Sequence, residues 1–322
     1  MQIAASDHWD GRHFHNVHDR TVKTLRDVWR WRRESRAVPW PRRIADPPQP
    51  PPPRLPTGRI GATFIGHASF LVQLGGRCVL VDPVWSERAS PLAFAGPKRV
   101  RAPGQALEAL PGCDLLLVSH NHYDHLDLPT LRQVRRRWSP PAVTGLDNAR
   151  HLAKAGIRGA AELDWWQSTE LAGLRVTYVP AQHFSARTPF DRNRSLWGGF
   201  VIESEGATVY FAGDSGWCPH FAEIAARFPR IDLALIPIGA YEPRSFMRTQ
   251  HIDPGEAVRA HQVLGARRSL GMHFGTFARL TDEAIEGPEA WLAEARAAAG
   301  LPAEAFATLP FGGSLDLAEL PR

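Results

Sequence analysis

The chain has 322 residues, of which 43% are hydrophobic and 22% are charged, a balance typical of a globular protein with a sizeable core. Its three cysteines, Cys78, Cys113 and Cys218, cannot all pair and form no C-x-x-C motif, which argues against a disulfide framework. No apolar run reaches the roughly 18 residues of a membrane span, and the first residues lack the apolar stretch of a signal peptide. We therefore expect a cytoplasmic protein.

The net charge of +5 lies in the N-terminal segment. Residues 1–57 hold 11 Lys and Arg against 6 Asp and Glu, whereas the rest of the chain holds 27 of each. Residues Thr21–Arg36 place Leu25, Val28 and Trp29 at helical spacing among several arginines. A helix that mixes Trp and Arg suits peripheral contact with a membrane, and it suits packing on the body of the protein equally well.

Proline dominates the residues that follow this helix. Residues 47–53 read PPQPPPP, and because proline cannot donate a backbone hydrogen bond, they predict an extended strap. We expect two parts: residues 1–57, a basic helix plus a Pro-rich strap, and a main domain over residues 58–322.

Apolar runs in the main domain predict strands. Ala62–Leu74 and Cys78–Val81 are joined by Gly75-Gly76 and predict a hairpin. Further strands are predicted at Asp114–Ser119, Leu174–Val179, Gly199–Glu203, Thr208–Ala212, Leu233–Ile238 and Ser269–Met272. Helices are predicted at Leu128–Arg137, Asn148–Ala155, Phe221–Arg227, Pro254–Leu264 and Glu283–Ala299. Paired strands followed by strands that alternate with helices predict α/β layers with mixed sheets.

The segment SHNHYDH directly follows one of these strands. It contains three imidazoles and a carboxylate within six residues, at His120, His122, Asp124 and His125. Imidazole and carboxylate are good ligands for zinc and similar metals. His120 and His122 can bind one ion while Asp124 and His125 bind a second. The segment therefore predicts a two-metal centre, and a His-rich surface loop is the weaker interpretation.

Three more candidate ligands follow apolar strands. They are His183, Asp214 and His273. A single histidine after a strand is more often structural than a ligand, but three such positions together with the His-rich segment strengthen the prediction. Asp214 can bridge two ions with its two oxygens, and its flanking glycines would let the backbone pass close to the metals.

This set of residues resembles the metallo-β-lactamase superfamily. The resemblance implies an α/β fold, a four-layer αβ/βα sandwich with the site at the sheet edges. It implies two zinc ions per chain, with iron or manganese as alternatives. One ion would be held by His120, His122 and His183 and the other by Asp124, His125 and His273, with Asp214 and a hydroxide bridging them. Asp124 and Asp214 would be catalytic.

A second group of motifs resembles the N-acylphosphatidylethanolamine-hydrolysing phospholipase D family. These motifs are IGHAS at 65–69, DPVWSERASP at 82–91, FAGPKR at 94–99, ELDWW at 162–166, IPIGAYEPR at 236–244 and QHIDP at 250–254. The resemblance implies cleavage of a phosphodiester in an N-acylated phospholipid, giving an N-acylethanolamine and phosphatidic acid. Tyr123 and His251 would bind the lipid. The chain departs from the family at Phe274, where Trp is usual, and at Ser215, where Thr is usual.

Other interpretations stay open. His67 and Asp82 could orient metal ligands or simply stabilise the fold. The same centre could hydrolyse a soluble lactone, thioester, or sugar or cyclic phosphate. A nuclease is disfavoured because residues 58–322 carry no net charge, so we expect no nucleic-acid partner. A non-catalytic metal-binding protein is disfavoured by the complete ligand set. The sequence leaves oligomeric state open.

Overall fold

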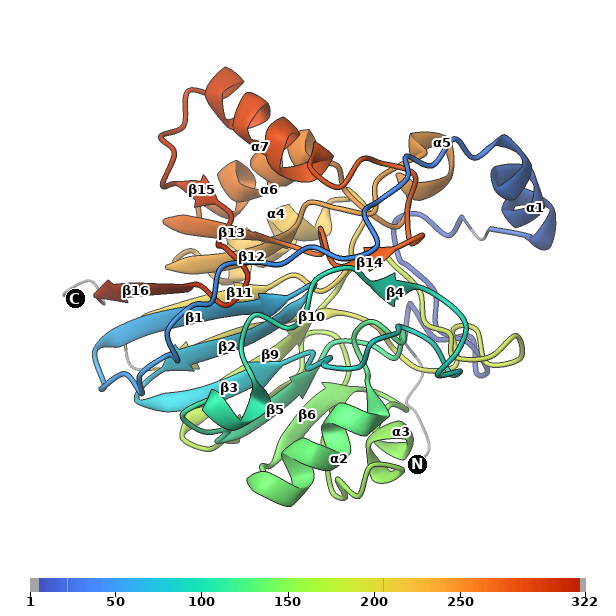
Figure 1. Cartoon of the computed structure of the whole chain (residues 1–322). Helices are drawn as coiled ribbons and strands as arrows, with labels where there is room; N and C mark the ends of the chain where they lie inside the picture. The colour runs from blue at the N-terminus through green and yellow to red at the C-terminus, as the bar shows by residue number, and fades with distance from the viewer. Residues whose placement is uncertain (1–5, 22, 205, 319–322) are drawn as a thin grey trace.

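The computed structural model describes residues 6–21, 23–204 and 206–318. Two seven-stranded mixed sheets pack face to face, and helices cover their outer faces (Figure 1). This is the four-layer αβ/βα sandwich that the motifs predict.

The first sheet has the strand order β16-β1-β2-β3-β5-β6-β7. Its strands are β1 (Arg59–Gly66), β2 (Ser69–Leu74), β3 (Arg77–Val81), β5 (Leu115–Val118), β6 (Ala142–Gly145), β7 (Ala161–Leu163) and β16 (Ser314–Ala318). The strands from β16 to β3 are antiparallel, and those from β3 to β7 are parallel. The parallel strands bring their carboxyl ends to one edge of the sheet.

The second sheet repeats this division, in the order β15-β13-β12-β11-β10-β9-β8. Its strands are β8 (Ser168–Leu171), β9 (Leu174–Val179), β10 (Gly199–Ser204), β11 (Ala207–Phe211), β12 (Leu233–Pro237), β13 (Arg268–Met272) and β15 (Phe306–Ala307). Strands β8 to β11 are antiparallel, and β11 to β15 are parallel. A small ribbon of β4 (Lys98–Arg99) and β14 (Phe277–Ala278) lies beside the sandwich.

Helices lie on both outer faces. The α-helices are α1 (Leu25–Glu34), α2 (Leu128–Arg137), α3 (Ala149–Ala153), α4 (His220–Arg227), α5 (Arg244–Met247), α6 (Pro254–Leu264) and α7 (Gly287–Ala298), with one 3-10 turn at η1 (Leu107–Ala109). Helices α2 and α3 cover the first sheet, and α4, α6 and α7 cover the second (Figure 1). Helix α1 lies apart from both layers, near α5.

Both faces of the first sheet are buried, which explains its continuous apolar runs. In β5, Leu115 and Leu117 join the core between the sheets, whereas Leu116 and Val118 join the core under α2 and α3. Successive side chains of a strand point to opposite faces, so each face takes alternate residues of the same run.

The predicted elements lie where the structure has helices and strands, but α1 and α7 are shorter than the predicted helices 21–36 and 283–299, and residue 22 lies outside the described residues. One predicted strand is divided. Ala62–Leu74 is not one strand, because the chain turns between β1 and β2 at His67, whose φ is 56°. The predicted hairpin is therefore β2–β3, joined through Gly75 and Gly76. The predicted helices at 128–137 and 254–264 have the observed bounds.

The residues before β1 pack closely on the body of the protein. Phe14 is only 1% exposed and belongs to the main core. Trp31 of α1 stacks on Phe246, with ring centroids 5.0 Å apart. The proline strap is held by Gln73 and Gln105, whose side-chain amides donate to carbonyl oxygens of the strap. Across the described residues, no helix is both long and apolar enough to cross a membrane.

Leu116 tests the outer core of the first sheet. Leu116→Ala leaves a cavity under α2 and should lower the free energy of unfolding by about 2 to 5 kcal/mol. Urea denaturation of the purified variant measures this loss. The matched control Glu170→Ala, on an exposed position of edge strand β8, should change it by less than about 0.5 kcal/mol. Equal effects would contradict the assignment of Leu116 to the core.

Candidate metal centre

The predicted ligands come together because the strands that carry them end at neighbouring edges. Strands β9, β11 and β13 run in the same direction, so His183, Asp214 and His273 emerge from the same edge of the second sheet. The SHNHYDH segment leaves the carboxyl end of β5 in the facing sheet. All seven predicted metal ligands are thereby gathered between the two sheets.

One group of possible ligands consists of His120, His122, His183 and Asp214. The Nδ1 atom of His122 lies 3.0 Å from Nε2 of His120 and 3.2 Å from Nε2 of His183. The Oδ2 atom of Asp214 lies 3.9 Å and 3.7 Å from those two Nε2 atoms. Three imidazole nitrogens and one carboxylate oxygen therefore point at a common position.

A second group consists of His67, Asp124, His125 and His273. The Oδ2 atom of Asp124 lies 3.0 Å from Nε2 of His67 and 3.4 Å from Nε2 of His273. Asp214 Oδ2 lies 3.1 Å from Nε2 of both His125 and His273. Asp214 thus lies between the two groups, in the place expected of a bridging ligand, and His67 contacts Asp124, which is the orienting contact that was one of its two interpretations.

The donor set fits metal ions. The Nδ1 atom of His122 faces two other ring nitrogens, at 3.0 and 3.2 Å, but it carries either one proton or one lone pair and can make only one good hydrogen bond. A cation between the three nitrogens would satisfy all of them. Among the described residues, the Oδ1 atom of Asp214 is buried and has no hydrogen-bond partner, and Nε2 of His273, 3.1 Å from Asp214 Oδ2, makes no hydrogen bond of suitable geometry. Buried polar atoms without partners are costly, and a bound cation would satisfy them. Imidazole with carboxylate is a donor set that suits zinc.

The charges of the centre are strongly coupled. Burial lowers the pKa of His122 to about 4. Burial also lowers the pKa of His273, but the carboxylates of Asp214 and Asp124 outweigh it and raise that pKa to about 9. Burial would raise the pKa of Asp214, yet His125 and His273 hold it well below its usual value. The metal-free centre therefore balances two carboxylates with protonated imidazoles, which bound ions would replace.

The ligands are oriented by hydrogen bonds to their other ring nitrogens. Asp82, which is fully buried, contacts Nδ1 of His125 at 2.7 Å and accepts from the backbone N–H of Ser119. The Nδ1 atom of His183 lies 3.0 Å from the carbonyl oxygen of Gln250. The sequence left open whether Asp82 orients a metal ligand or only stabilises the fold, and its contact with His125 fits the orienting role. Ser119 and Gln250 were not singled out by the sequence, because neither residue type signals such a role.

Several turns of the centre have unusual backbone conformations. His67, Asp82 and His273 have φ values of 56°, 42° and 63°, and strained residues of this kind cluster at functional sites. Gly213 also has positive φ, and a Cβ there would lie 2.5 Å from the carbonyl oxygen of Gly198. The glycine before Asp214 is therefore needed for close packing of two backbone segments.

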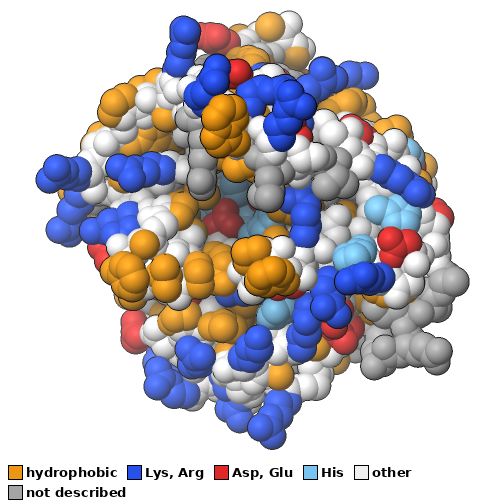
Figure 2. Space-filling model, turned by 90° about the vertical axis from the view of Figure 1, so that its right-hand side faces the viewer, with side chains coloured by type: hydrophobic (Ala, Val, Ile, Leu, Met, Phe, Trp, Pro, Cys, Tyr) orange, Lys and Arg blue, Asp and Glu red, His pale blue; other side chains and the backbone are white. Residues whose placement is uncertain are grey.

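A cavity of about 300 Å³ opens above the centre. Figure 2 shows it as a hollow with acidic and histidine side chains at its bottom and hydrophobic side chains at its border. Ligands from both groups line it, as do Tyr123 and His251. Its apolar walls come from Trp31, Ala89, Phe184, Ala186, Phe246, Met247 and Leu280.

Tyr123 and His251, the two residues predicted to bind substrate, differ in whether their polar atoms are already hydrogen-bonded. The hydroxyl of Tyr123 donates to the carbonyl oxygen of Arg187, whose guanidinium lies 3.9 Å from the Tyr123 ring centroid. The Nδ1 atom of His251 is buried and has no hydrogen-bond partner in the part of the chain that the structure describes, and burial lowers the pKa of His251 to about 4. His251 therefore offers a neutral imidazole to the cavity. Arg187, which also donates to the carbonyl oxygens of Asn121 and Leu126 around the ligand loop, was not foreseen.

Known proteins are similar to this chain in sequence. A family model described as a beta-lactamase superfamily domain matches residues 77–274. An N-acyl-phosphatidylethanolamine-hydrolyzing phospholipase D of Caenorhabditis elegans is 43% identical over 235 residues, which cover 69% of this chain and 65% of the worm protein. A metal-dependent hydrolase of Caldivirga maquilingensis is 30% identical over 226 residues, covering 69% of this chain and 86% of that protein.

A solved structure agrees on the fold. Igni18, a metallo hydrolase from Ignicoccus hospitalis, superposes with a TM-score of 0.61 at 22% identity and covers 80% of this chain and 98% of its own. The chain therefore belongs to the metallo-β-lactamase superfamily, and its described residues include groups that could hold metal ions. Within that superfamily, its sequence is similar to the N-acylphosphatidylethanolamine-hydrolysing phospholipases D, although it spans less than two thirds of the worm protein's length.

Asp214 tests the centre directly. Asp214→Asn removes the charge that lies between the two groups, so we expect the loss of one or both ions and of nearly all activity. Metal content is measured by elemental analysis of the purified protein. The control is Asp232→Asn, a buried carboxylate that accepts from the backbone of Thr208, which should keep the wild-type metal content. Full metal content and full rate in Asp214→Asn would contradict a shared ligand.

Proposed function

We propose that the chain is a dinuclear zinc hydrolase that cleaves the phosphodiester of an N-acylphosphatidylethanolamine-type phospholipid. Water is consumed, the bond between phosphorus and the ethanolamine oxygen breaks, and an N-acylethanolamine and phosphatidic acid are released. The observation that carries the proposal is the pairing of two four-residue ligand groups with an apolar cavity directly above them. Iron or manganese would be compatible with the same ligands.

The ligands divide between two ions. We assign His120, His122 and His183 to one ion and Asp124, His125 and His273 to the other, with Asp214 between them. Two bound ions would lower the pKa of a water molecule toward neutrality and neutralise charge on phosphoryl oxygens. His67 contacts Asp124 at 3.0 Å and holds that carboxylate in place.

Tyr123 and His251 are proposed to bind the substrate. A neutral imidazole carries one N–H, and on Nδ1 of His251 it would donate to a phosphoryl or amide oxygen. The hydroxyl proton of Tyr123 is used by the Arg187 carbonyl, so its oxygen remains as an acceptor for the amide N–H of the substrate. The two residues would orient the headgroup without taking part in metal binding.

The surface around the cavity supports a lipid substrate. Phe190 is 90% exposed, Phe94 80% and Trp29 62%. Each of the three lies a few residues from side chains that line the cavity. Phe190 follows Phe184 and Ala186, Phe94 follows Ala89, and Trp29 precedes Trp31. Lysine and arginine side chains surround this face (Figure 2). Exposed aromatics with basic neighbours suit an anionic lipid surface.

Peripheral membrane contact is thus proposed for three segments, of which α1 is one. The N-terminal helix would share the contact with the loops around Phe94 and Phe190. The substrate would enter the cavity from the bilayer surface while the protein itself stays in the cytoplasm.

The proposal is tested with purified, metal-counted protein. We expect two metals per chain and release of N-acylethanolamine from N-acylphosphatidylethanolamine in mixed micelles. Cleavage of a soluble bis-aryl phosphodiester alone would keep the phosphodiesterase chemistry and remove the lipid. If neither substrate is cleaved by the two-metal protein, the phosphodiesterase proposal fails, and lactones and thioesters become the substrates to test on the same centre.

His251 separates substrate binding from metal binding. His251→Ala should lower kcat/KM for the lipid about tenfold or more, the effect of losing roughly one hydrogen bond to the reacting group, while metal content stays at the wild-type value. His151→Ala, which removes a buried histidine on the outer helix α3, should leave both unchanged. Loss of metal from His251→Ala would instead make it a ligand.

The exposed aromatics separate lipid from soluble substrates. Replacing Phe94 and Phe190 together with serine should weaken sedimentation with vesicles containing phosphatidylserine and lower turnover in micelles, because apolar area that would enter the interface is lost. Turnover of the soluble diester should not change. Val263→Ser, at an exposed apolar position of α6, is the control. Unchanged vesicle binding in the double variant would argue against this surface.

A further inference from the structure

The N-terminal segment, residues 6–21, reaches the metal centre from outside the matched family domain, which begins at residue 77. The segment is anchored by Phe14, which is buried in the main core and whose backbone N–H donates to the carbonyl oxygen of Asn193 at 2.7 Å. Two residues further on, Asn16 lies against the predicted metal ligand His183.

Asn16 binds the main chain of His183 at two points. Its Nδ2 donates to the carbonyl oxygen of His183 at 2.9 Å, and its Oδ1 accepts from the backbone N–H of His183 at 3.2 Å. The indole N–H of Trp197 donates to the same Oδ1 at 3.1 Å and fixes the amide group. All three hydrogen bonds, one donated by Nδ2 and two accepted by Oδ1, match the amide chemistry of asparagine.

These contacts matter because His183 lies beyond the end of its strand. Strand β9 ends at Val179, and among the described residues neither the N–H nor the carbonyl oxygen of His183 has a backbone partner. By contrast, the backbone N–H of His273 donates to the carbonyl oxygen of His67. The main chain of His183 is thus held by the Asn16 side chain, in place of the ladder that a strand would supply.

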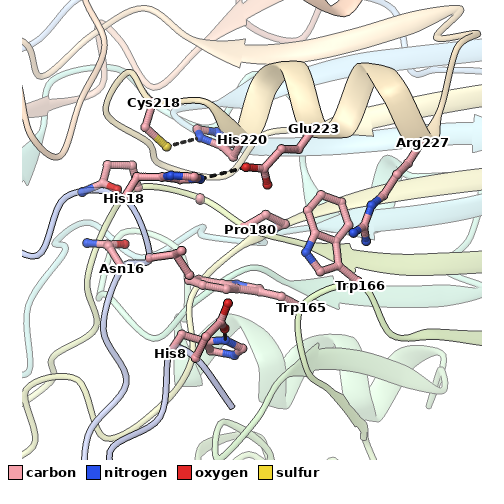
Figure 3. Close-up of a pocket in the computed structure, with 14 residues that line it drawn as sticks. His8, Asn16, His18, Trp165, Trp166, Pro180, Cys218, His220, Glu223 and Arg227 are labelled. Atoms are coloured by element: carbon pink, nitrogen blue, oxygen red, sulfur yellow. Dashed lines mark hydrogen bonds and ion pairs between the residues drawn. The ribbon is translucent and has the colours of Figure 1, made fainter.

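His8 of the segment stacks on Trp165, with ring centroids 4.3 Å apart, and beside this contact the segment borders a cavity. A cavity of about 250 Å³ separates it from the body, with Trp165 and Pro180 on its walls (Figure 3). This cavity shares no lining residue with the one above the metal centre. Across it, His18 reaches Glu223 at 2.9 Å. Within the described residues, the side-chain hydrogen bonds between the segment and residues 182–183 are those of Asn16 and one from Gln182 to the carbonyl oxygen of Asp19.

We propose that Asn16 is a positioning residue for the metal centre: its side-chain amide fixes the main chain of His183 and so sets the affinity of the ion that His183 helps to hold. Residues 6–21 would then contribute to metal binding, in addition to packing on the main domain. This inference rests on the proposed role of His183 as a ligand.

The effect should be confined to one ion. Asn16 touches His183 of the first group and no member of the second. Contacts that orient metal ligands typically change metal affinity by about 10- to 100-fold. We therefore expect Asn16→Ala to weaken the binding of one zinc ion by about that factor and to leave the other ion within about twofold of wild type.

The experiment is a zinc competition with a chromophoric chelator, on the full chain, for wild type, Asn16→Ala, Asn16→Leu and His13→Ala. His13 lies in the same segment, and its side chain makes no hydrogen bond within the described residues, so this variant should match wild type. Urea unfolding of the metal-free proteins, measured in parallel, reports any loss of fold stability. Asn16→Leu keeps the side-chain volume if Asn16→Ala is too unstable to purify.

The outcomes are distinct. Selective weakening of one ion in folded Asn16 variants supports the inference. The inference is overturned if each ion binds to the Asn16 variants with the same affinity as to wild type. A lower unfolding midpoint together with unchanged zinc affinities also overturns it, because Asn16 would then be merely structural. Failure of wild type itself to bind two zinc ions would overturn the proposed dinuclear centre, a result that is separate from any difference between the variants.

Discussion

The carboxylate of Asp214 is the constraint around which the centre is built. Its Oδ2 atom lies within 4.0 Å of a ring nitrogen from each of four histidines, on both sides of the centre, and the residue is 3% exposed. A buried charge of this kind is tolerated only where other charges or metals compensate it. Two facing sheets must therefore deliver imidazoles to one point, and the direction of the parallel strands in each sheet makes that delivery possible.

Holding the ligands at this point imposes costs on the backbone. His67, Asp82 and His273 adopt positive φ values, each of which costs of order 1 to 3 kcal/mol unless the surroundings enforce it. The surroundings here include buried hydrogen bonds, such as those that the Asp82 carboxylate accepts from the Ser119 backbone N–H and makes with His125 Nδ1. The strain is thus concentrated in turns at the edge of a well-packed core, where it sets the direction of the ligand side chains.

Much of the centre was predictable because its chemistry is carried by uncommon residues at strand ends. The SHNHYDH segment and the histidines after β9 and β13 stand out from the apolar runs before them. The sequence left the role of His67 open, because it interrupts what reads as one strand, and only the turn between β1 and β2 places it against Asp124. Asn16 gave no signal at all, since an asparagine in an irregular segment is common and its partner is 167 positions away.

The short strands show the same limit for the fold. β16 pairs with β1 across almost the whole chain, and its residues are largely exposed or half-buried, so local pattern does not distinguish it from a loop. The strands that were predicted correctly are the buried ones, such as β5 and β9, whose apolar runs are unbroken. Burial leaves a trace in the sequence, whereas pairing at an edge depends on the partner strand.

The N-terminal region contacts both the cavity and the predicted metal centre. Trp31 of α1 lines the cavity above the centre, and Asn16, nine residues before the start of the same helix, holds the main chain of His183 below it. The excess positive charge of the chain also lies in this region. An anionic surface that attracts the region would therefore act on residues that border the cavity and, through a short stretch of chain, on a residue that contacts a metal ligand. Since Asn16 bonds to backbone atoms of His183 and not to its ring, a shift of the segment would move the ligand as a whole without changing its chemistry.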